Sequence, residues 1–202
     1  MYVVGLTGGI GAGKSEAARI FSEIGVPVVD VDVISRRLTG IGQPLVAKIA
    51  HAFGKEYVTV DGAMDREKIR ERIFSSDADR RLLESILHPV IHSEALRELE
   101  SYHRAPYQIL AIPLFFESNR YEGIVNRTLL IDCDKDLQVS RVVNRNGFTE
   151  KMVRSIIATQ ASRSFRRALA NDIIDNNGTI EELEQNVHRM HEKFIKTCAV
   201  SE

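Results

Sequence analysis

Residues 8–15 read Gly-Gly-Ile-Gly-Ala-Gly-Lys-Ser, and they lie between an apolar run at residues 2–6 and a helical pattern that starts at Glu16. A loop this rich in glycine turns its backbone N–H groups inward around a bound anion, because glycine adopts backbone angles that side chains forbid. Lys14 then reaches the β- and γ-phosphates, Ser15 ligates Mg²⁺, and the positive end of the following helix faces the same phosphates. The stretch predicts a strand, a phosphate loop and a helix, in that order.

A turn that only joined a strand to a helix would need one or two glycines and no Lys-Ser pair at the helix start. The helix has independent support. Apolar residues at positions 17, 20, 21 and 24 follow the spacing of one buried face, and Gly25 with Pro27 forms a stop signal.

The composition favours a single α/β domain in the cytoplasm. The chain has 202 residues, which suits one domain with insertions, and its net charge of −1 argues against a dedicated nucleic-acid binder. Cys133 and Cys198 lie far apart without C-x-x-C spacing, which is typical of thiols in a reducing compartment. No run approaches the ~18 apolar residues that span a bilayer, and no secretory signal pattern is found, so we expect no membrane partner.

Short apolar runs alternate with helical patterns along the chain. The runs lie at residues 2–7, 26–31, 107–112, 128–132 and 172–175. Continuous apolar runs separated by helices are typical of a parallel sheet covered on both faces. The sequence therefore predicts an α/β fold with a five-stranded parallel sheet, built from residues of about 1–32, 106–135 and 171–202.

About seventy residues separate the second run from the third, far more than a simple crossover requires. This insertion, about residues 33–105, is predicted to be helical. Its expected buried faces contain Leu45, Val46, Ile49 and Phe53, then Ile69 and Ile73, then Leu82, Leu83, Ile86 and Leu87. Pro89 is expected to begin a further helix, because proline is favoured at the first helical position. A charged segment at about residues 136–170, with a turn at Asn146-Gly147, is expected to form a lid.

Three carboxylates follow predicted strands at the carboxyl edge of the sheet, where open α/β folds bind their ligands. Asp30 and Asp32 end the second run, and strand periodicity would point both to one side, toward the phosphate loop. One of them is then a candidate base or Mg²⁺ contact. The alternative is that they cap the next helix. Glu117, after the third run, either lines the site or caps the chain from residue 118 onward.

Arginines are concentrated in the predicted lid, at Arg141, Arg145, Arg154, Arg163, Arg166 and Arg167. Arg141 and Arg145 are four residues apart, so they share a helix face from which they would clamp phosphates. The alternative is a solvated charged face. The sequence favours that alternative for Arg166 and Arg167.

Histidines do not form a convincing metal site. His88 and His92 have the spacing of a zinc-binding helix, but Pro89 stands where a zinc protease has its glutamate, and no third ligand is evident. His188 and His191 are expected on a solvated helix face.

Several segments together resemble the dephospho-coenzyme A kinase family in order and spacing. They are Leu6 to Ser15, Asp30-Val-Asp32, Leu87-His-Pro89, Pro113-Leu-Phe-Phe-Glu117, Gln138 with Arg141 and Arg145, Gln160 with Arg163, and Ile174-Asp-Asn-Asn-Gly178. The phosphate loop is shared by many NTPases, so the later segments give the resemblance its specificity.

The resemblance implies a P-loop NTPase fold with a nucleotide-kinase-like core, a helical coenzyme A subdomain at about residues 33–105 and an arginine-rich lid. It implies transfer of the γ-phosphate of ATP to the ribose 3′-hydroxyl of dephospho-CoA, which completes coenzyme A synthesis. The implied catalytic residues are Lys14, Asp32, Arg141 and Arg145. The implied ATP-binding residues are Gly9, Gly11, Ala12, Gly13, Lys14, Ser15 and Glu16, with Asn176 and Gly178 near the adenine. Ser15 and Asp32 are the implied Mg²⁺ contacts, and the oligomeric state stays open.

The chain departs from the family pattern in a few places. Glu16 replaces a usual Thr, Val31 a usual Ala and Phe115 a usual Leu, and residues 165–167 replace an often acidic stretch. The charge of Glu16 beside the α-phosphate is expected to weaken nucleotide affinity modestly.

Two other functions compete with this interpretation. A nucleoside or small-metabolite kinase would share the loop, the acidic base and the arginine lid, and the inserted helical region would distinguish it. A regulatory GTPase switch fits poorly, because guanine selection normally uses Asn-Lys-x-Asp and the nearest stretch, Cys133-Asp-Lys-Asp136, lacks the Asn.

Overall fold

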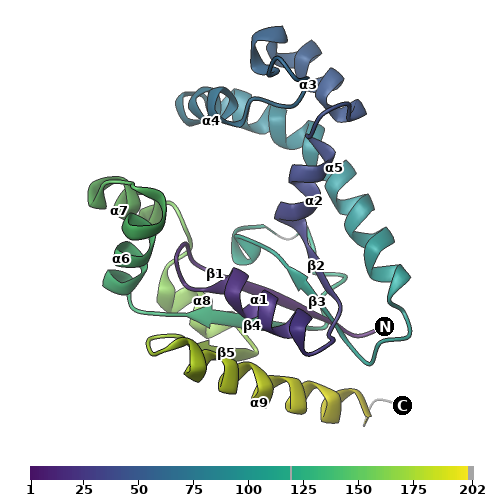
Figure 1. Ribbon diagram of the computed structural model, residues 1–202, viewed down its shortest axis with the longest axis vertical. Coiled ribbons are helices and arrows are strands. Elements are labelled where there is room, and N and C mark those ends of the chain that lie inside the picture. Colours follow the sequence, from purple (N-terminus) through teal and green to yellow (C-terminus); the bar gives the residue numbers. More distant parts are fainter. Residues whose placement is uncertain (119, 200–202) are drawn as a thin grey trace. The chain divides into compact units, whose positions relative to one another are not determined.

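The computed structural model describes residues 1–118 and 120–199, which divide into two compact units (Figure 1). The sheet unit comprises residues 1–29 together with the chain from Tyr102 onward, and the helical unit comprises Asp30–Ser101. Residues 200–202, which the sequence analysis includes in the core, lie outside the described residues.

The predicted five-stranded sheet is confirmed, with the strand order β2-β3-β1-β4-β5. Its strands are β1 (Val3–Gly8), β2 (Val28–Asp30), β3 (Gln108–Ala111), β4 (Arg127–Asp132) and β5 (Asp172–Asp175). The central strand β1 pairs in parallel with both β3 and β4, and β4 pairs in parallel with β5. Because β1 is central, it places the loop that follows it in the middle of the carboxyl edge of the sheet.

In the sheet unit, helices follow the strands and cover the sheet. They are α1 (Lys14–Glu23), the short 3₁₀ turn η2 (Phe115–Glu117), α6 (Lys135–Asn146), α7 (Glu150–Ala158), α8 (Arg163–Leu169) and α9 (Ile180–Ala199). Figure 1 shows α1 and α9 beside the sheet, and both contribute to its main core, with Phe21 and Phe194 fully buried. A smaller core at Val139, Val142 and Val153 joins α6 to α7.

The helical unit contains α2 (Val31–Leu38), α3 (Pro44–Phe53), the 3₁₀ turn η1 (Lys55–Tyr57), α4 (Arg66–Ser75) and α5 (Asp77–Ser101). Its core gathers Ile49, Met64, Ile69 and Leu83, in agreement with the faces predicted for the insertion. Leu82 is the exception, because it is 41 % exposed. It precedes Leu83 by one position, which turns it away from the buried face of the helix.

The prediction that Pro89 begins a helix is wrong, because α5 continues through it without a break. Proline removes one backbone hydrogen bond inside a helix and crowds the carbonyl four residues earlier, which normally breaks the helix. Here the buried residues Leu83, Ile91, Ala95 and Leu99 lie on both sides of Pro89. Their burial offsets the local cost, so tertiary packing decides the conformation.

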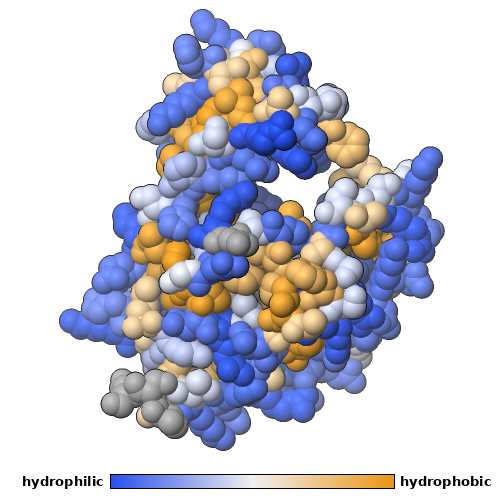
Figure 2. All heavy atoms as spheres, turned by 180° about the vertical axis from the view of Figure 1, so that it is seen from behind, coloured by the Kyte–Doolittle hydropathy of each residue, from blue (hydrophilic) through white to orange (hydrophobic). Residues whose placement is uncertain are grey.

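Hydrophilic side chains cover most of the visible surface, with hydrophobic patches between them (Figure 2). Throughout residues 1–118 and 120–199, no helix has the length and apolar character that crossing a membrane requires.

Candidate active site

The phosphate loop lies between β1 and α1, as predicted. Gly13 is the N-cap of α1 with φ 102° and ψ 15°, a left-handed conformation that favours glycine. Gly11 also has a positive φ, of 72°. These two residues reverse the chain so that the first turn of α1 begins at Lys14 and directs its N-terminal end back over the loop.

Three side-chain amides hold the loop from outside. The Nε2 of Gln138 donates to the carbonyl of Ile10 at 2.9 Å, and the Oε1 of Gln160 accepts the Ile10 N–H at 3.2 Å. Directly after β5, the Nδ2 of Asn176 donates to the carbonyl of Ala12 at 2.8 Å. The loop shape is therefore fixed by α6, by the segment after α7 and by the end of β5, before any ligand binds.

These braces explain why the loop needs glycine. A methyl group on Gly9 would lie 2.6 Å from Gln138 Nε2, and one on Gly13 would lie 2.2 Å from Asn176 Nδ2. Both distances are shorter than any normal contact to a carbon atom. At Gly9 and Gly13, therefore, the absent side chain leaves room for the bracing amides.

Several loop N–H groups are left for a ligand. Within the described part of the chain, the backbone N–H groups of Gly11, Gly13 and Ser15 make no hydrogen bond to protein atoms. The Ala12 N–H, in contrast, donates to the carbonyl of Gly9 at 3.0 Å. Converging N–H groups at a helix N-terminus form an anion site. Ser15 is exposed at the same end of α1.

Glu16 has a partner that the sequence analysis did not foresee. Its Oε1 accepts from the Nη2 of Arg19 at 2.5 Å and from the Nε at 2.9 Å. These hydrogen bonds, with that to Glu23, raise the pKa of Arg19 above its usual value. The adjacent cation reduces the field of Glu16 at the helix start, so we expect only a small effect of Glu16 on nucleotide affinity.

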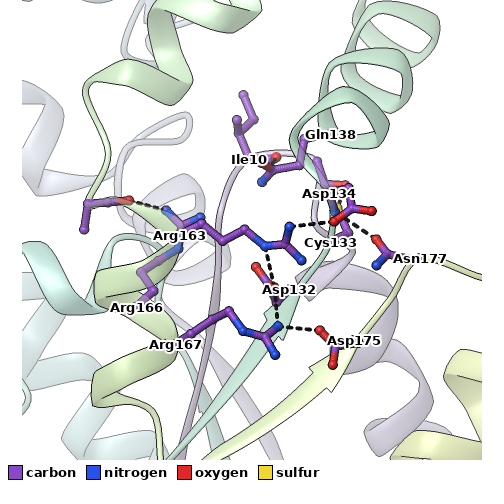
Figure 3. A network of polar contacts seen from close by, with 12 residues as sticks. Ile10, Asp132, Cys133, Asp134, Gln138, Arg163, Arg166, Arg167, Asp175 and Asn177 are labelled. Atoms are coloured by element: carbon purple, nitrogen blue, oxygen red, sulfur yellow. Dashed lines mark hydrogen bonds and ion pairs between the residues drawn. The ribbon is translucent and has the colours of Figure 1, made fainter.

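An ion-pair network fastens α8 to the carboxyl ends of β4 and β5 (Figure 3). The buried carboxylate of Asp132 accepts from Arg163 Nε at 2.8 Å and from Arg167 Nη1 at 2.6 Å. Arg163 also pairs with Asp134 at 2.5 Å, and Arg167 pairs with Asp175. These hydrogen bonds raise the pKa of both arginines. The network is structural, and local sequence patterns did not indicate it.

Removing the central carboxylate tests this role. We expect Asp132→Ala to lower the free energy of unfolding in urea by about 1 to 3 kcal/mol, because two donors lose their acceptor. The matched control is Asp136→Ala. Asp136 is exposed and pairs with Arg154 at 2.9 Å, so its loss should cost at most about 0.5 kcal/mol. Equal losses for both variants would contradict the structural role of Asp132.

The two predicted phosphate clamps lie in different surroundings on α6. Arg141 is partly buried, and its Nη1 is buried without a hydrogen-bond partner among the described residues. It lies close enough to Cys133 for its charge to lower the thiol pKa, although burial has the larger effect and raises that pKa. Arg145 is exposed, and its Nε donates to Asn146 Oδ1 at 2.9 Å. Of these two arginines on α6, Arg141 is thus the one that presents a buried, unsatisfied donor among the described residues.

The interpretation of Arg166 as part of a solvated face is wrong. Arg166 is 5 % exposed, and its Nη1 donates to the carbonyl of Ala161 at 2.6 Å. The backbone N–H of Ala161 in turn donates to Glu117 Oε1 at 2.8 Å. Glu117 therefore fixes the segment between α7 and α8.

The prediction that Asp30 and Asp32 share one face of a strand is wrong. The strand β2 ends at Asp30, and α2 begins at Val31, so Asp32 lies in the first helical turn of the helical unit. The Oδ1 of Asp30 accepts from the N–H groups of Asp32 at 2.8 Å and of Val33 at 3.3 Å. This is the capping alternative, and it holds for Asp30 alone.

Within the helical unit, Asp32 has a cationic neighbour, Arg66, that the sequence analysis missed. Burial lowers the pKa of Arg66, the charge of Arg36 lowers it further, and Asp32 raises it. The Nη2 of Arg66 donates to Thr39 Oγ1 at 2.6 Å, which fixes its position. The Arg66 guanidinium is thus held close enough to Asp32 for the two charges to interact.

The remaining candidates have structural contacts. Gly178 precedes α9, and a methyl group there would lie 1.5 Å from Glu182 Oε2. His191 does not lie on a purely solvated face, because its Nδ1 is hydrogen-bonded to the Tyr107 hydroxyl at 2.8 Å. In the described residues, no three His, Cys, Asp or Glu side chains are grouped to hold a metal ion.

Comparison with known proteins identifies relatives over nearly the whole chain. The family model for dephospho-CoA kinase matches residues 2–182. The dephospho-CoA kinase of Chromobacterium violaceum is 45 % identical over 193 residues, which covers 96 % of this chain and 94 % of that protein. The dephospho-CoA kinase of Nitrosospira multiformis is 43 % identical, covering 96 % of this chain and 97 % of its own.

Solved structures with the same fold include TT1252 from Thermus thermophilus, with a TM-score of 0.82. The two sequences are 29 % identical, and the match covers 95 % of this chain and 97 % of that chain. The dephospho-CoA kinase from Campylobacter jejuni has a TM-score of 0.71 at 22 % identity, covering 96 % of this chain and 98 % of its own. Shikimate kinase from Acinetobacter baumannii is more distant, with a TM-score of 0.55 at 17 % identity, covering 98 % of this chain and 94 % of its own. That likeness shows the fold alone.

Proposed function

This chain belongs to the dephospho-CoA kinase family, a family of ATP-dependent kinases, and we propose that its phosphate loop, Asp32 and two lid arginines carry out the reaction. In that reaction the γ-phosphate of ATP moves to the ribose 3′-hydroxyl of dephospho-CoA. The proposal assigns the ATP phosphates to residues 9 and 11–16, the adenine to the segment 176–178, and dephospho-CoA to the helical unit. We place the enzyme in the cytoplasm.

The open N–H groups of the phosphate loop are the observation that carries this proposal. Gly11, Gly13 and Ser15 offer three N–H groups at the start of α1, on a loop already braced by amides. A preformed set of donors stabilises charge as it develops during phosphoryl transfer, without reorganisation at the moment of reaction. Lys14 adds a point charge at the β- and γ-phosphates.

Mg²⁺ belongs to this proposal as the partner of ATP. Ser15 offers an exposed hydroxyl, and Asp32 offers a carboxylate in the helical unit. Oxygen ligands of these kinds suit Mg²⁺, which usually takes few protein ligands in addition to substrate phosphates and water. When bound, the ion neutralises charge on the transferring phosphoryl group.

The acceptor distinguishes this function from that of another small-molecule kinase. A coupled assay of ADP release should be run with dephospho-CoA, adenosine, AMP, shikimate and water as acceptors, in the presence of Mg²⁺ and ATP. We expect rapid release with dephospho-CoA alone. Rapid release with adenosine, AMP or shikimate and slow release with dephospho-CoA would overturn the proposal.

The two lid arginines are expected to contribute to turnover more than to folding. Arg141→Lys and Arg145→Lys keep the charge but remove the planar fork that binds phosphate with two parallel hydrogen bonds. We expect each variant to lower kcat about tenfold, the effect of one charge-assisted hydrogen bond. Melting temperatures should stay unchanged.

Arg154→Lys is the matched control for these variants. Arg154 lies on α7 and is engaged by Glu150 at 2.8 Å and by Asp136 at 2.9 Å. Its replacement should leave kcat near the parent value. If the kinetics of Arg141→Lys and Arg145→Lys are also unchanged, neither arginine acts as a phosphate clamp.

A further inference from the structure

The helix α8 carries three arginines with very different surroundings. Arg163 and Arg167 are neutralised by Asp132, and each has a second carboxylate partner. Arg166 has no carboxylate partner among residues 1–118 and 120–199. Within those residues, the hydrogen bond to the Ala161 carbonyl is the one hydrogen bond that its side chain makes. Its Nε is buried without a hydrogen-bond partner.

This unpaired guanidinium lies against the phosphate loop. A methyl group placed on Gly9 would lie 2.9 Å from Arg166 Nη2, and it would be 3.2 Å from Gln160 Oε1. Gln160 in turn binds the Ile10 N–H. Arg166 therefore belongs to the group of side chains that surround the loop, and it is the cationic member of that group.

A buried cation without a counter-ion is costly, because desolvation is not offset by an ion pair. A carboxylate reaches Arg166 only through the Ala161 peptide group. The Ala161 carbonyl accepts from Arg166, and the Ala161 N–H donates to the Glu117 carboxylate at 2.8 Å. That contact orients the guanidinium and leaves its Nε unsatisfied. A polyphosphate held by the loop would supply the missing negative charge and the acceptor oxygens.

We propose that Arg166 contacts the phosphates of the bound nucleotide across Gly9, in addition to Lys14. This inference rests on the proposed function, because it needs a polyphosphate in the loop. Arg166 is thus a further nucleotide-binding residue, and its uncompensated charge makes the ligand-free sheet unit less stable than the bound form.

Thermal unfolding and calorimetry with inorganic tripolyphosphate and with ATP test the proposal. Arg166→Met keeps much of the side-chain length and removes the charge. We expect the dissociation constant for tripolyphosphate to rise at least about tenfold, the loss expected for one charge-assisted hydrogen bond. The melting temperature without ligand should stay equal or rise, since a buried unpaired charge has been removed. The stabilisation by ligand should shrink.

Arg167→Met is the control, because Arg167 lies on the same helix but is paired with Asp132 and Asp175. It should lower the ligand-free melting temperature and keep the affinity for tripolyphosphate. A purely structural Arg166 would behave like Arg167: a lower ligand-free melting temperature with unchanged affinity overturns the proposal. If Arg166→Met does not fold, Arg166→Lys is compared with the parent protein, and equal affinity overturns it.

The same data separate this inference from the proposed function. A parent protein that binds neither ATP nor tripolyphosphate refutes the nucleotide site itself, and the role of Arg166 with it. A parent protein that binds both, with Arg166→Met binding equally well, refutes only the role of Arg166.

Discussion

Replacing Lys14 with alanine is expected to remove most phosphoryl transfer and to leave the fold intact. Lys14 is the first residue of α1, directly after the Gly13 cap, and we propose that its ammonium group acts where charge develops on the transferring phosphoryl group. Loss of one such donor typically lowers kcat by about 10²- to 10³-fold. Alanine has a higher helix propensity than lysine, so the start of α1 should be retained.

Steady-state kinetics and circular dichroism of the purified variant provide the measurement. The control is Lys196→Ala, because Lys196 is an exposed residue on α9. That variant should keep the parent rate. If folded Lys14→Ala stays within about threefold of the parent rate, which corresponds to less than ~1 kcal/mol, the role assigned to Lys14 is wrong.

The strands and the phosphate loop could be predicted because they depend on local chemistry. The glycines at positions 11 and 13 need positive φ angles, and apolar runs in a doubly covered parallel sheet contain few polar residues. The bracing amides of the loop are a different case. Gln138 and Asn176 lie more than a hundred residues from the loop in sequence, so no local pattern relates them to it.

The error at Asp30 and Asp32 has a local cause. An apolar run at residues 26–31 extends the strand pattern, but Val31, Ile34 and Leu38 also follow helical spacing, and Asp is a favoured N-cap. The cap prevailed, because the Asp30 carboxylate satisfies two N–H groups of the first turn of α2. The capping alternative was therefore accessible from the sequence.

The burial of Arg166, in contrast, could not be predicted from the sequence. Residues 163–167 are rich in arginine, and a solvated helix face is the ordinary explanation for such a run. Arg163 and Arg167 are four positions apart on α8, and Asp132 binds both of them. This ion pairing determines which face of α8 packs against the protein. Because that ion-pair network is formed by distant strands, the environment of the residue between them follows only from the fold.

Asp32→Asn is expected to lower kcat by at least about a hundredfold while ATP binding survives. An alcohol is a poor nucleophile at neutral pH, and a general base that accepts its proton typically contributes ~10²- to 10⁴-fold. Asparagine keeps the size and one acceptor oxygen of aspartate but removes its basicity. The α2 cap should persist, since Asp30 binds the backbone N–H of residue 32 and not its side chain.

Asp30→Asn is the matched control, because asparagine is an equally good N-cap and should preserve both the start of α2 and the rate. Melting temperatures, ATP affinity and kcat with dephospho-CoA should be measured for both variants. A slow Asp32→Asn with unchanged ATP affinity separates a catalytic carboxylate from a binding one. If Asp30→Asn is inactive and Asp32→Asn is not, the two roles are reversed. If both variants turn over at the parent rate, the pair is structural, and the base is a different residue.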